Sequence, residues 1–254
     1  MAGDLINRGP DNLRPLRRVR ELVEAGRAHY VLGNHEIALI SAALGVRELS
    51  PFDSFTDVLD APDAAEWLAW LRERPLLVEG VQGEQPFAMV HAAAHPEWTL
   101  AALADRAARA AARLGDDDEH LALWLRSTGD ADRDLLGRLT RCRSIDARGS
   151  WSSATPSVEL GARPWHEVWS KGCHEYGVVY GHWALQGLHV APMLRGLDTG
   201  CVHHGRGRDG VLTAWLPAPD AAHPFDLPDD RFWHVPARRA YYAHRDSVSG
   251  STRP

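Results

Sequence analysis

The chain has 254 residues, of which 44% are hydrophobic and 24% are charged, and its formal net charge is −6. This length and composition are ordinary for a soluble globular protein with one sizeable domain or two small ones. The negative net charge argues against non-specific binding to nucleic acid. No signal peptide opens the sequence, and no apolar run approaches the length of a membrane span. We therefore expect neither a nucleic acid nor a membrane as partner.

The three cysteines are Cys142, Cys173 and Cys201. Their odd number and lack of close pairing argue against a disulfide framework and favour a reducing compartment, so we expect a cytoplasmic protein. Cys173 precedes His174, and Cys201 lies near His203, but this spacing matches no closed zinc motif. The cysteines therefore do not predict a structural zinc site.

Hydrophobic periodicity predicts helices and strands that alternate along the chain. Apolar residues recur at helical spacing over 13–23, over 37–44 and, after a cap at 60–62, over 67–71, and Gly26 and Pro75 follow the first and third of these helices. Short apolar runs predict strands at 29–32, 76–78, 87–90, 177–180, 194–197, 211–216 and 231–235. The motif GNHE, at 33–36, then lies between a strand and a helix, where α/β folds place their chemistry.

Residues 97–140 differ in character from the rest of the chain, because they are rich in alanine, arginine, leucine and acidic residues. We interpret them as two or three helices that form an insert over the site. The polar tail, 245–254, is expected to be disordered. We treat 1–254 as a single domain.

Polar side chains recur at the ends of the apolar runs, or beside a glycine, in one repeated pattern. Asp4 lies in GDLINRG, Asn34 lies in GNHE, and His91 and His182 each follow a predicted strand. A single histidine at a strand end is more often a satisfied core residue, but four such positions in order are typical of a metal site. Carboxylate, amide oxygen and imidazole ligands suit Mn, Fe, Co or Zn.

The motifs GDLINRG, GNHE, VHA, GHW and LDTG follow one another in this order. Together they resemble the calcineurin-like metallophosphoesterases of the phosphoprotein-phosphatase branch, and most closely the symmetrical diadenosine tetraphosphatase family. Further matches lie at 61–77, 90–98, 139–143 and 163–165, so the resemblance extends across nearly the whole chain.

The resemblance implies an α/β metallophosphatase sandwich of two mixed β-sheets flanked by helices, with the helical insert over the active site. It implies hydrolysis of diadenosine tetraphosphate to two ADP by a metal-activated hydroxide. Two divalent transition metals, such as Mn, Co, Fe or Zn, would act together on the phosphate. The implied partner is a small dinucleoside polyphosphate, and no protein partner is implied.

Carried over by motif, Asp4 would bridge the two metals, and Asn34, His91 and His182 would complete the second metal site. Arg8 would hold a phosphate oxygen, because its planar guanidinium suits bidentate contacts.

The resemblance makes His35 the general acid near the leaving oxygen. It also gives Arg141, with Arg143, further phosphate contacts. The alternative for both arginines is a solvated basic strand edge.

The sequence departs from the family pattern at its first motif, Asp-x-His-Gly, which is absent. The sequence Asp118-Glu119-His120 lies in an acidic run and is expected to be surface charge. We therefore expect a preceding segment to carry the motif, and the 254-residue form to bind at most one tight metal ion and hydrolyse the dinucleotide poorly. Asn7 stands where many relatives carry an aspartate that orients the acid histidine.

Two other functions remain open at the level of sequence. One is a protein serine/threonine phosphatase of the same superfamily, and the other is a nucleotide-binding protein that has lost catalysis with its first metal site. Among the ten tryptophans, Trp165 and Trp183 are candidates to stack an adenine, although core packing is the commoner role.

Overall fold

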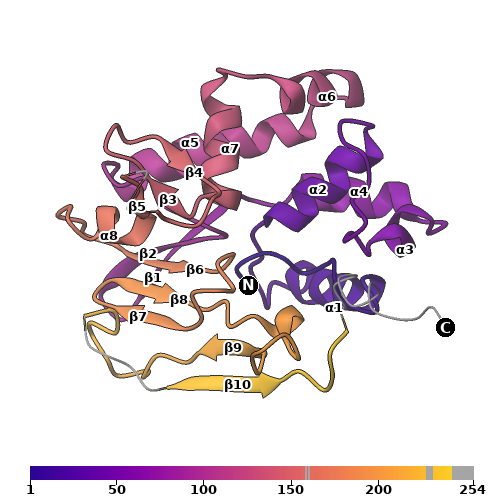
Figure 1. The fold of residues 1–254 in the computed structure, drawn as a ribbon. Helices are drawn as coiled ribbons and strands as arrows, with labels where there is room; N and C mark the ends of the chain where they lie inside the picture. Colours follow the sequence, from indigo (N-terminus) through magenta and orange to yellow (C-terminus); the bar gives the residue numbers. More distant parts are fainter. Residues whose placement is uncertain (158, 160, 227–230, 242–254) are drawn as a thin grey trace, which may run out of the picture.

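The structure, a computed structural model, describes residues 1–157, 159, 161–226 and 231–241, so the tail predicted to be disordered lies outside the described residues (Figure 1). The helices are α1 (Leu13–Glu24), α2 (Asn34–Ala43), α3 (Thr56–Leu59), α4 (Ala64–Arg72), α5 (Leu100–Ala112), α6 (Asp118–Arg126), α7 (Ala131–Arg141) and α8 (Trp165–Trp169). The strands are β1 (Leu77–Gln82), β2 (Gln85–Val90), β3 (Ser144–Ile145), β4 (Trp151–Ser152), β5 (Arg163–Pro164), β6 (Gly177–Tyr180), β7 (His189–Ala191), β8 (Leu194–Gly196), β9 (Val211–Trp215) and β10 (Phe232–Pro236).

A mixed sheet of five strands, in the order β1-β2-β6-β8-β7, forms the centre of the fold. Strands β2, β6 and β8 run parallel to one another, while β1 and β7 run antiparallel at the two edges. The four residues of β6 are buried, which is why this strand reads as a continuous apolar run rather than an alternating one. Parallel strands end at the same edge of a sheet, so the segments that follow β2, β6 and β8 meet there.

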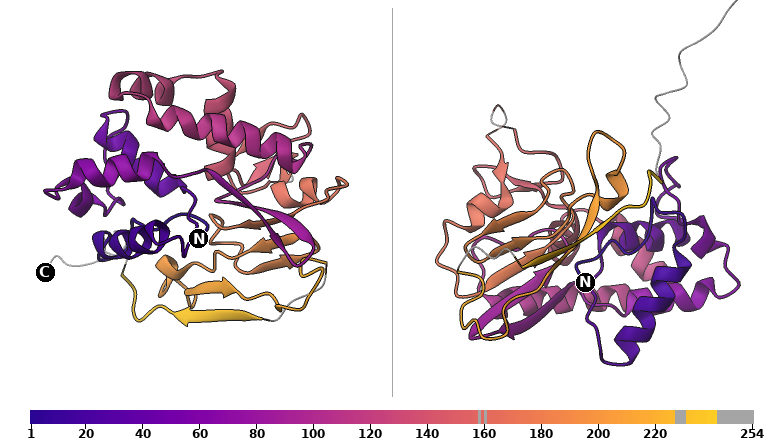
Figure 2. Two further views of the ribbon diagram at one scale, coloured as in Figure 1. Left: turned by 180° about the vertical axis from the view of Figure 1, so that it is seen from behind. Right: turned by 90° about the horizontal axis from the view of Figure 1, so that it is seen from below.

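A second, smaller sheet consists of β9 and β10, which pair antiparallel beside the central sheet (Figures 1 and 2). Arg195, at the centre of β8, is fully buried, and its guanidinium lies 4.9 Å from the ring of Trp215 in β9. Two sheets of an α/β protein are thus in contact, which confirms the predicted fold class. Within the described residues the second sheet is an antiparallel ribbon rather than a mixed sheet.

The strand predicted at 29–32 is wrong, although its burial is as expected. Tyr30, Val31 and Leu32 are buried, but the segment belongs to none of the strands. The amide of Leu32 donates to the carbonyl of Pro75 at 3.0 Å, and that of Val31 to the carbonyl of Met1 at 3.2 Å. These bonds go to different segments, so no continuous ladder forms, and apolar periodicity alone cannot reveal this.

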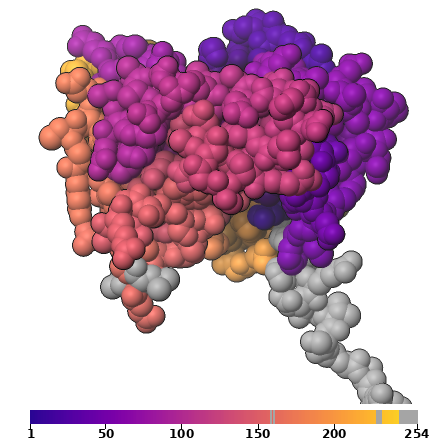
Figure 3. All heavy atoms as spheres, turned by 90° about the horizontal axis from the view of Figure 1, so that it is seen from above, coloured from indigo at the N-terminus to yellow at the C-terminus, as the bar shows by residue number. Residues whose placement is uncertain are grey.

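The segment 97–140 is helical, as predicted, and forms α5, α6 and α7. Each helix begins at a residue whose side chain accepts a backbone N–H, namely Thr99, Asp117 and Asp130. Seen from above, these helices and the segment that holds α2 to α4 form one helical face of the molecule (Figure 3). In the part of the chain that the structure describes, no helix is both long and apolar enough to cross a bilayer.

Candidate metal-binding active site

Two parallel strands of the central sheet bring His91 and His182 together. His91 directly follows β2, and His182 follows β6 after Gly181. The amide of Gly181 donates to the carbonyl of His91 at 2.8 Å, which extends the pairing of the two strands by one step. The centroids of the two imidazole rings lie 5.1 Å apart. The strand ends therefore present two nitrogen ligands at one point.

Glycines allow two further segments to approach these histidines closely. Gly3 has a φ of +80°, and a Cβ at this position would lie 2.5 Å from Nδ1 of His91. A Cβ on Gly33 would overlap the carboxylate of Asp4. Any larger residue at either glycine would push Asp4 and Asn34 away from the strand ends, so both motifs need glycine.

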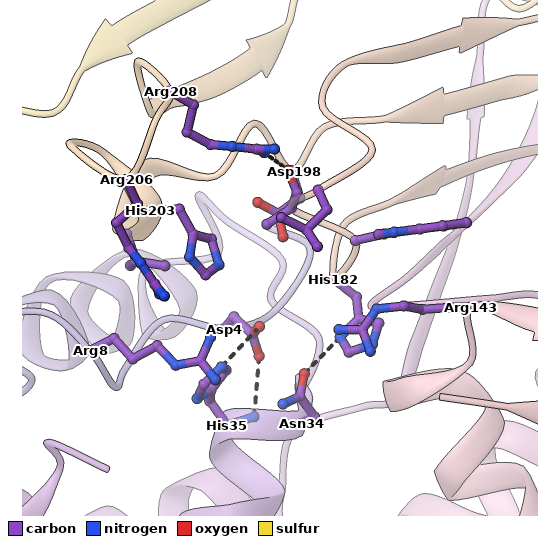
Figure 4. A pocket seen from close by; sticks show the side chains of 14 residues that line it. Asp4, Arg8, Asn34, His35, Arg143, His182, Asp198, His203, Arg206 and Arg208 are labelled. Atoms are coloured by element: carbon purple, nitrogen blue, oxygen red, sulfur yellow. Dashed lines mark hydrogen bonds and ion pairs between the residues drawn. The ribbon is translucent and has the colours of Figure 1, made fainter. Parts of the chain in front are cut away.

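The side chains of four residues converge on one small volume, and Figure 4 shows three of them, those of Asp4, Asn34 and His182. Nε2 of His91 lies 3.3 Å from Oδ1 of Asp4 and 3.1 Å from Oδ1 of Asn34. Nδ1 of His182 lies 2.8 Å from the same Asn34 oxygen. The ligand atoms of Asp4, His91 and His182 all lie within 4.8 Å of one another. The structure thus brings together all four residues that the sequence predicts as metal ligands.

The outward nitrogens of both rings point to backbone carbonyls. Nδ1 of His91 lies 2.6 Å from the oxygen of Ala2, and Nε2 of His182 lies 3.1 Å from the oxygen of Arg141. A carbonyl only accepts, so these nitrogens carry the proton, and in a neutral ring the inward nitrogen keeps its lone pair. Lone pairs then face one another across the site, an arrangement that a cation stabilises. Metal-binding histidines commonly donate their second nitrogen to a carbonyl in this way.

The charges around the site also favour a cation between these side chains. Burial opposes ionisation of Asp4, but the nearby His91 and His35 hold the pKa of its carboxyl below the ordinary value. Burial likewise lowers the pKa of His91, but the charge of Asp4 outweighs it and raises this pKa to about 9. Burial, with His91 and Arg143 nearby, lowers the pKa of His182 well below its usual value. Without a metal, a proton on His91 takes the place of the cation.

The backbone is strained at this site. Among the described residues, five that are not glycine have positive φ, and four of them belong to these segments: Asp4, Asn7, Arg8 and His182, with φ between 53° and 79°. Such conformations are uncommon for residues with a Cβ and persist only where the surroundings enforce them. Their concentration here marks the segment 3–9 and the turn after β6 as functional.

Asn7 fixes the orientation and tautomer of His35. The amide oxygen of Asn7 accepts from the backbone N–H of Arg8 at 2.9 Å and of Ser54 at 2.8 Å. Its nitrogen therefore faces Nδ1 of His35 at 2.7 Å and must donate to it. Nδ1 is then the acceptor and the proton of the neutral ring lies on Nε2, which is 3.7 Å from Oδ2 of Asp4.

A cavity of about 400 Å³ opens above the four ligands. Asp4, Asn34, His35 and His182 line its floor. The other side chains that line it are Arg8, Arg143, Trp183, Ala184, Leu185, Asp198, Val202, His203, Arg206 and Arg208. The arginines carry positive charge on several walls of a cavity large enough for a small anionic ligand.

The sequence interpretation missed the wall formed by Asp198, His203, Arg206 and Arg208. Asp198 belongs to the LDTG motif, which follows β8 and so reaches the same sheet edge as the histidines. The basic residues lie just beyond this motif, in the sequence HHGRGRD at 203–209. This local cluster of basic residues was a signal that the sequence offered.

Two of the three arginines predicted to contact phosphate, Arg141 and Arg143, are placed differently from each other. Arg143 lines the cavity, and its backbone is held by a third sheet, of three strands in the order β4-β3-β5, because its amide donates to the carbonyl of Ser152 in β4 at 2.8 Å. The side chain of Arg141 is not among the lining residues, and its guanidinium lies 5.9 Å from the centroid of Trp151. Arg141 contributes its carbonyl to His182, so its predicted role as a phosphate contact has no support from the geometry.

All the remaining candidates except Trp183 follow the commoner interpretation. Trp165 is buried and packs edge-on against Tyr180 at 4.9 Å between centroids, whereas Trp183 lines the cavity. The run at 118–120 is exposed at the start of α6. Among the described residues, the cysteines and their neighbouring histidines form no group able to hold a metal.

Comparison with known proteins connects this site to a family. No protein-family model matches the chain. A protein of Ralstonia nicotianae named symmetrical bis(5'-nucleosyl)-tetraphosphatase is 37% identical over 225 residues, which cover 81% of this chain and 76% of the relative. Proteins with the same name are 36% identical in Burkholderia thailandensis, with the same coverage, and 35% identical in Nitrosospira multiformis, where 81% and 78% of the two chains are covered.

Solved structures support the same fold. A crystal structure of a protein proposed to be a diadenosine tetraphosphatase aligns with a TM-score of 0.56 and 22% identity, and the match covers 92% of this chain and 78% of the other. At this identity the likeness shows the fold alone.

Proposed function

Because this chain belongs to the family of symmetrical bis(5'-nucleosyl)-tetraphosphatases, we propose that it hydrolyses diadenosine tetraphosphate to two molecules of ADP. One observation carries the proposal: arginine side chains surround a cluster of inward-facing ligand atoms in a single cavity. A phosphoanhydride carries several negative charges close together and needs both features. The relatives favour neither a protein phosphatase nor a non-catalytic nucleotide-binding protein.

Asp4, Asn34, His91 and His182 would hold a divalent transition metal, with Mn, Co, Fe and Zn as candidates. Their ligand atoms are the hard oxygens and imidazole nitrogens that these ions prefer. When bound, such an ion activates water for attack and neutralises charge on the phosphoryl oxygens. The inward lone pairs of these residues and the carbonyls behind both rings support this assignment.

The other side chains would bind and orient the substrate. Arg8 and Arg143 line the cavity beside the ligands and would neutralise the phosphate under attack. His35, with its proton on Nε2, would donate to the oxygen of the departing ADP. The side chain of Trp183, which lines the cavity, would stack one adenine. The partner is thus a small molecule, and the three free cysteines support a reducing, cytoplasmic location.

The test is an analysis of products by chromatography after incubation of the full chain with diadenosine tetraphosphate and manganese. ADP as the sole nucleotide product is expected. AMP together with ATP would show asymmetric cleavage and contradict the proposal. A phosphopeptide assayed in parallel separates the alternatives, because phosphate release from the peptide without turnover of the dinucleotide would identify a protein phosphatase instead.

A further inference from the structure

The segment between the LDTG motif and β9 places three basic side chains in the cavity, those of His203, Arg206 and Arg208. Figure 4 shows them on the side of the cavity opposite Asn34, with Asp4 between. Neither binding of a metal nor proton donation to the leaving group requires a positive charge at this distance from the ligands. This basic wall therefore has a role other than these two.

The basic wall is built as a compact loop rather than an extended one. Gly200, Gly205 and Gly207 have φ of 68°, 79° and 74°, which lets the chain turn repeatedly. The amide of Arg206 donates to the carbonyl of His203 at 3.2 Å, and that of Gly205 to the carbonyl of Arg208 at 3.2 Å. These turns hold the two arginines on the same side of the loop.

One of the arginines also connects the loop to the opposite side of the cavity mouth. Nη1 of Arg208 donates to the carbonyl of Ala184 at 2.7 Å. Ala184 lies between Trp183 and Leu185, which line the cavity as well. The guanidinium is thereby positioned before any ligand arrives, which reduces the entropy lost when it binds an anion.

The cavity carries more positive than negative charge. Four guanidinium groups line it, against the carboxylates of Asp4 and Asp198. Burial first, and then the charges of Arg8, Arg206 and Arg208, lower the pKa of His203 to about 4, so this ring is neutral at pH 7. Burial and the positive charge of three arginines thus both disfavour a proton on His203.

A single phosphate group does not match this arrangement. A phosphomonoester carries at most two charges at one point, and Arg8 and Arg143 flank that point beside the metal ligands. A polyphosphate carries about one charge on each phosphate along an extended chain. Only such a chain places negative charge both at the ligands and at the opposite wall.

We propose that Arg206 and Arg208 form an outer phosphate subsite that binds the part of a polyphosphate chain farthest from the metal ligands, and that they thereby select long polyphosphates over single phosphate groups. This inference rests on the proposed function for the identity of the natural substrate, but the subsite itself recognises polyphosphate.

The test compares the binding of inorganic tripolyphosphate and inorganic orthophosphate to the full chain by calorimetry in the presence of EDTA. Arg206→Gln and Arg208→Gln should each weaken tripolyphosphate binding about tenfold or more, as expected for a lost charge-assisted hydrogen bond. Orthophosphate binding should change less than about twofold, because it uses the inner arginines. Arg18→Gln, on the exposed face of α1, is the matched control.

Loss of affinity for both anions to the same degree, or for neither, would overturn the subsite. In kinetics, the same variants should raise KM for diadenosine tetraphosphate about tenfold and leave kcat nearly unchanged, since the subsite binds rather than reacts. The proposed function and the proposed subsite can each be refuted without the other. Strong tripolyphosphate binding that depends on Arg206, without ADP formation, would refute the function alone. ADP formation, together with unchanged tripolyphosphate binding in Arg206→Gln and Arg208→Gln, would refute the subsite alone.

Discussion

At the scale of residues, the side-chain nitrogen of Asn7 determines which nitrogen of the His35 ring carries the proton. An aspartate at this position would accept a hydrogen bond from Nδ1–H of the ring, whereas the Asn7 nitrogen donates a hydrogen bond to Nδ1. The same nitrogen donates to Oδ1 of Asp53 at 3.0 Å, so the orientation of the amide is fixed from both sides. The neutral ring therefore presents Nε2–H to the cavity, which is the form that a proton donor needs.

Asn7→Asp should reverse this tautomer. The new carboxylate would accept from Nδ1 of His35, and it would also lie beside the carboxylate of Asp53, which is destabilising. The ¹⁵N chemical shifts of the His35 ring in the metal-free protein report which nitrogen is protonated. We expect Nε2–H in the original protein and Nδ1–H in the variant. A proton on Nδ1 of the original protein would contradict the role given to Asn7.

Removal of single ligands tests the metal site directly. Asn34→Ala and His182→Ala should each weaken binding of Mn or Zn, because each deletes an inward lone pair. Metal affinity should fall by more than the roughly 10–100-fold that follows removal of a residue that only hydrogen-bonds to a metal ligand. Elemental analysis after dialysis measures the retained metal. His120→Ala, which removes an exposed imidazole from α6, is the control. Equal metal content in all four proteins would disprove the ligand set.

At this scale the sequence predicted four side chains that the structure brings together, but it did not predict the basic wall of the cavity. Asp4, Asn34, His91 and His182 were identifiable because each lies in a short motif whose order along the chain is characteristic. The cavity positions of Arg206 and Arg208 depend on how a glycine-rich loop folds back over the sheet edge, which no local pattern specifies. The direction of the Arg141 side chain, toward Trp151 rather than the cavity, is likewise a matter of tertiary packing.

At the scale of elements, Glu36 connects the first turn of α2 to the segment that carries Asp4. Its carboxylate accepts from four backbone amides, those of Gly33 at 2.8 Å, Asp4 at 3.1 Å, Leu5 at 2.8 Å and Ile6 at 3.3 Å. Glu36 is fully buried. One side chain therefore caps α2 and holds the GDLINRG segment in its strained conformation, so the two motifs behave as one unit.

Glu36→Gln tests this connection. The substituted amide keeps one accepting oxygen and places an N–H₂ group against backbone N–H donors, so about half of the four bonds are lost. Each buried donor left unsatisfied costs about 1–3 kcal/mol, and we expect a total loss of unfolding free energy of about 2–5 kcal/mol. Urea denaturation monitored by tryptophan fluorescence measures it.

The matched control for this prediction is Glu24→Gln, which removes the charge of an exposed glutamate paired with Arg20 on α1. It should change the unfolding free energy by less than about 1 kcal/mol. Equal effects of the two substitutions would show that the backbone of the GDLINRG segment is held by other contacts.

In the central sheet, β2 and β6 were predicted because both are apolar runs that end at a motif, whereas β7 was not predicted. The segment 29–32 has the same composition, yet its hydrogen bonds go to Met1 and Pro75 rather than to one strand. Pairing across the chain, and not the apolar pattern, decides which buried segment becomes a strand.

For the molecule as a whole, a polar network behind the cavity connects α8, β6, β7 and the loop after His182. Nε2 of His166 lies 2.7 Å from Nε2 of Gln186, and the hydroxyl of Tyr180 donates to Oε1 of Gln186 at 3.1 Å. The same hydroxyl lies 2.7 Å from Nδ1 of His189. Gln186 must donate to His166, so this ring has to remain neutral on that nitrogen.

The network predicts how the stability of the protein depends on pH. Burial, and then His189, lower the pKa of His166 to about 4, and burial with nearby arginines lowers the pKa of His95 to about 4 as well. In the unfolded chain a histidine has a pKa of about 6.5. Between about pH 6.5 and 4 the unfolded chain therefore binds more protons than the folded protein, and its population grows as the pH falls.

We expect the contribution of His166 and His95 to the unfolding free energy of the metal-free protein to be complete above about pH 6.5 and to be lost progressively as the pH falls toward 4. His91, whose pKa is raised to about 9, acts in the opposite sense, because its contribution is lost as the pH rises through about 9. Urea denaturation at a series of pH values measures the curve. His166→Gln removes one of the responsible groups and keeps a side chain that can pair with Gln186, so its curve should be flatter over the same range. An identical slope in the variant would mean that His166 is already protonated in the folded protein, and that Gln186 does not donate to it.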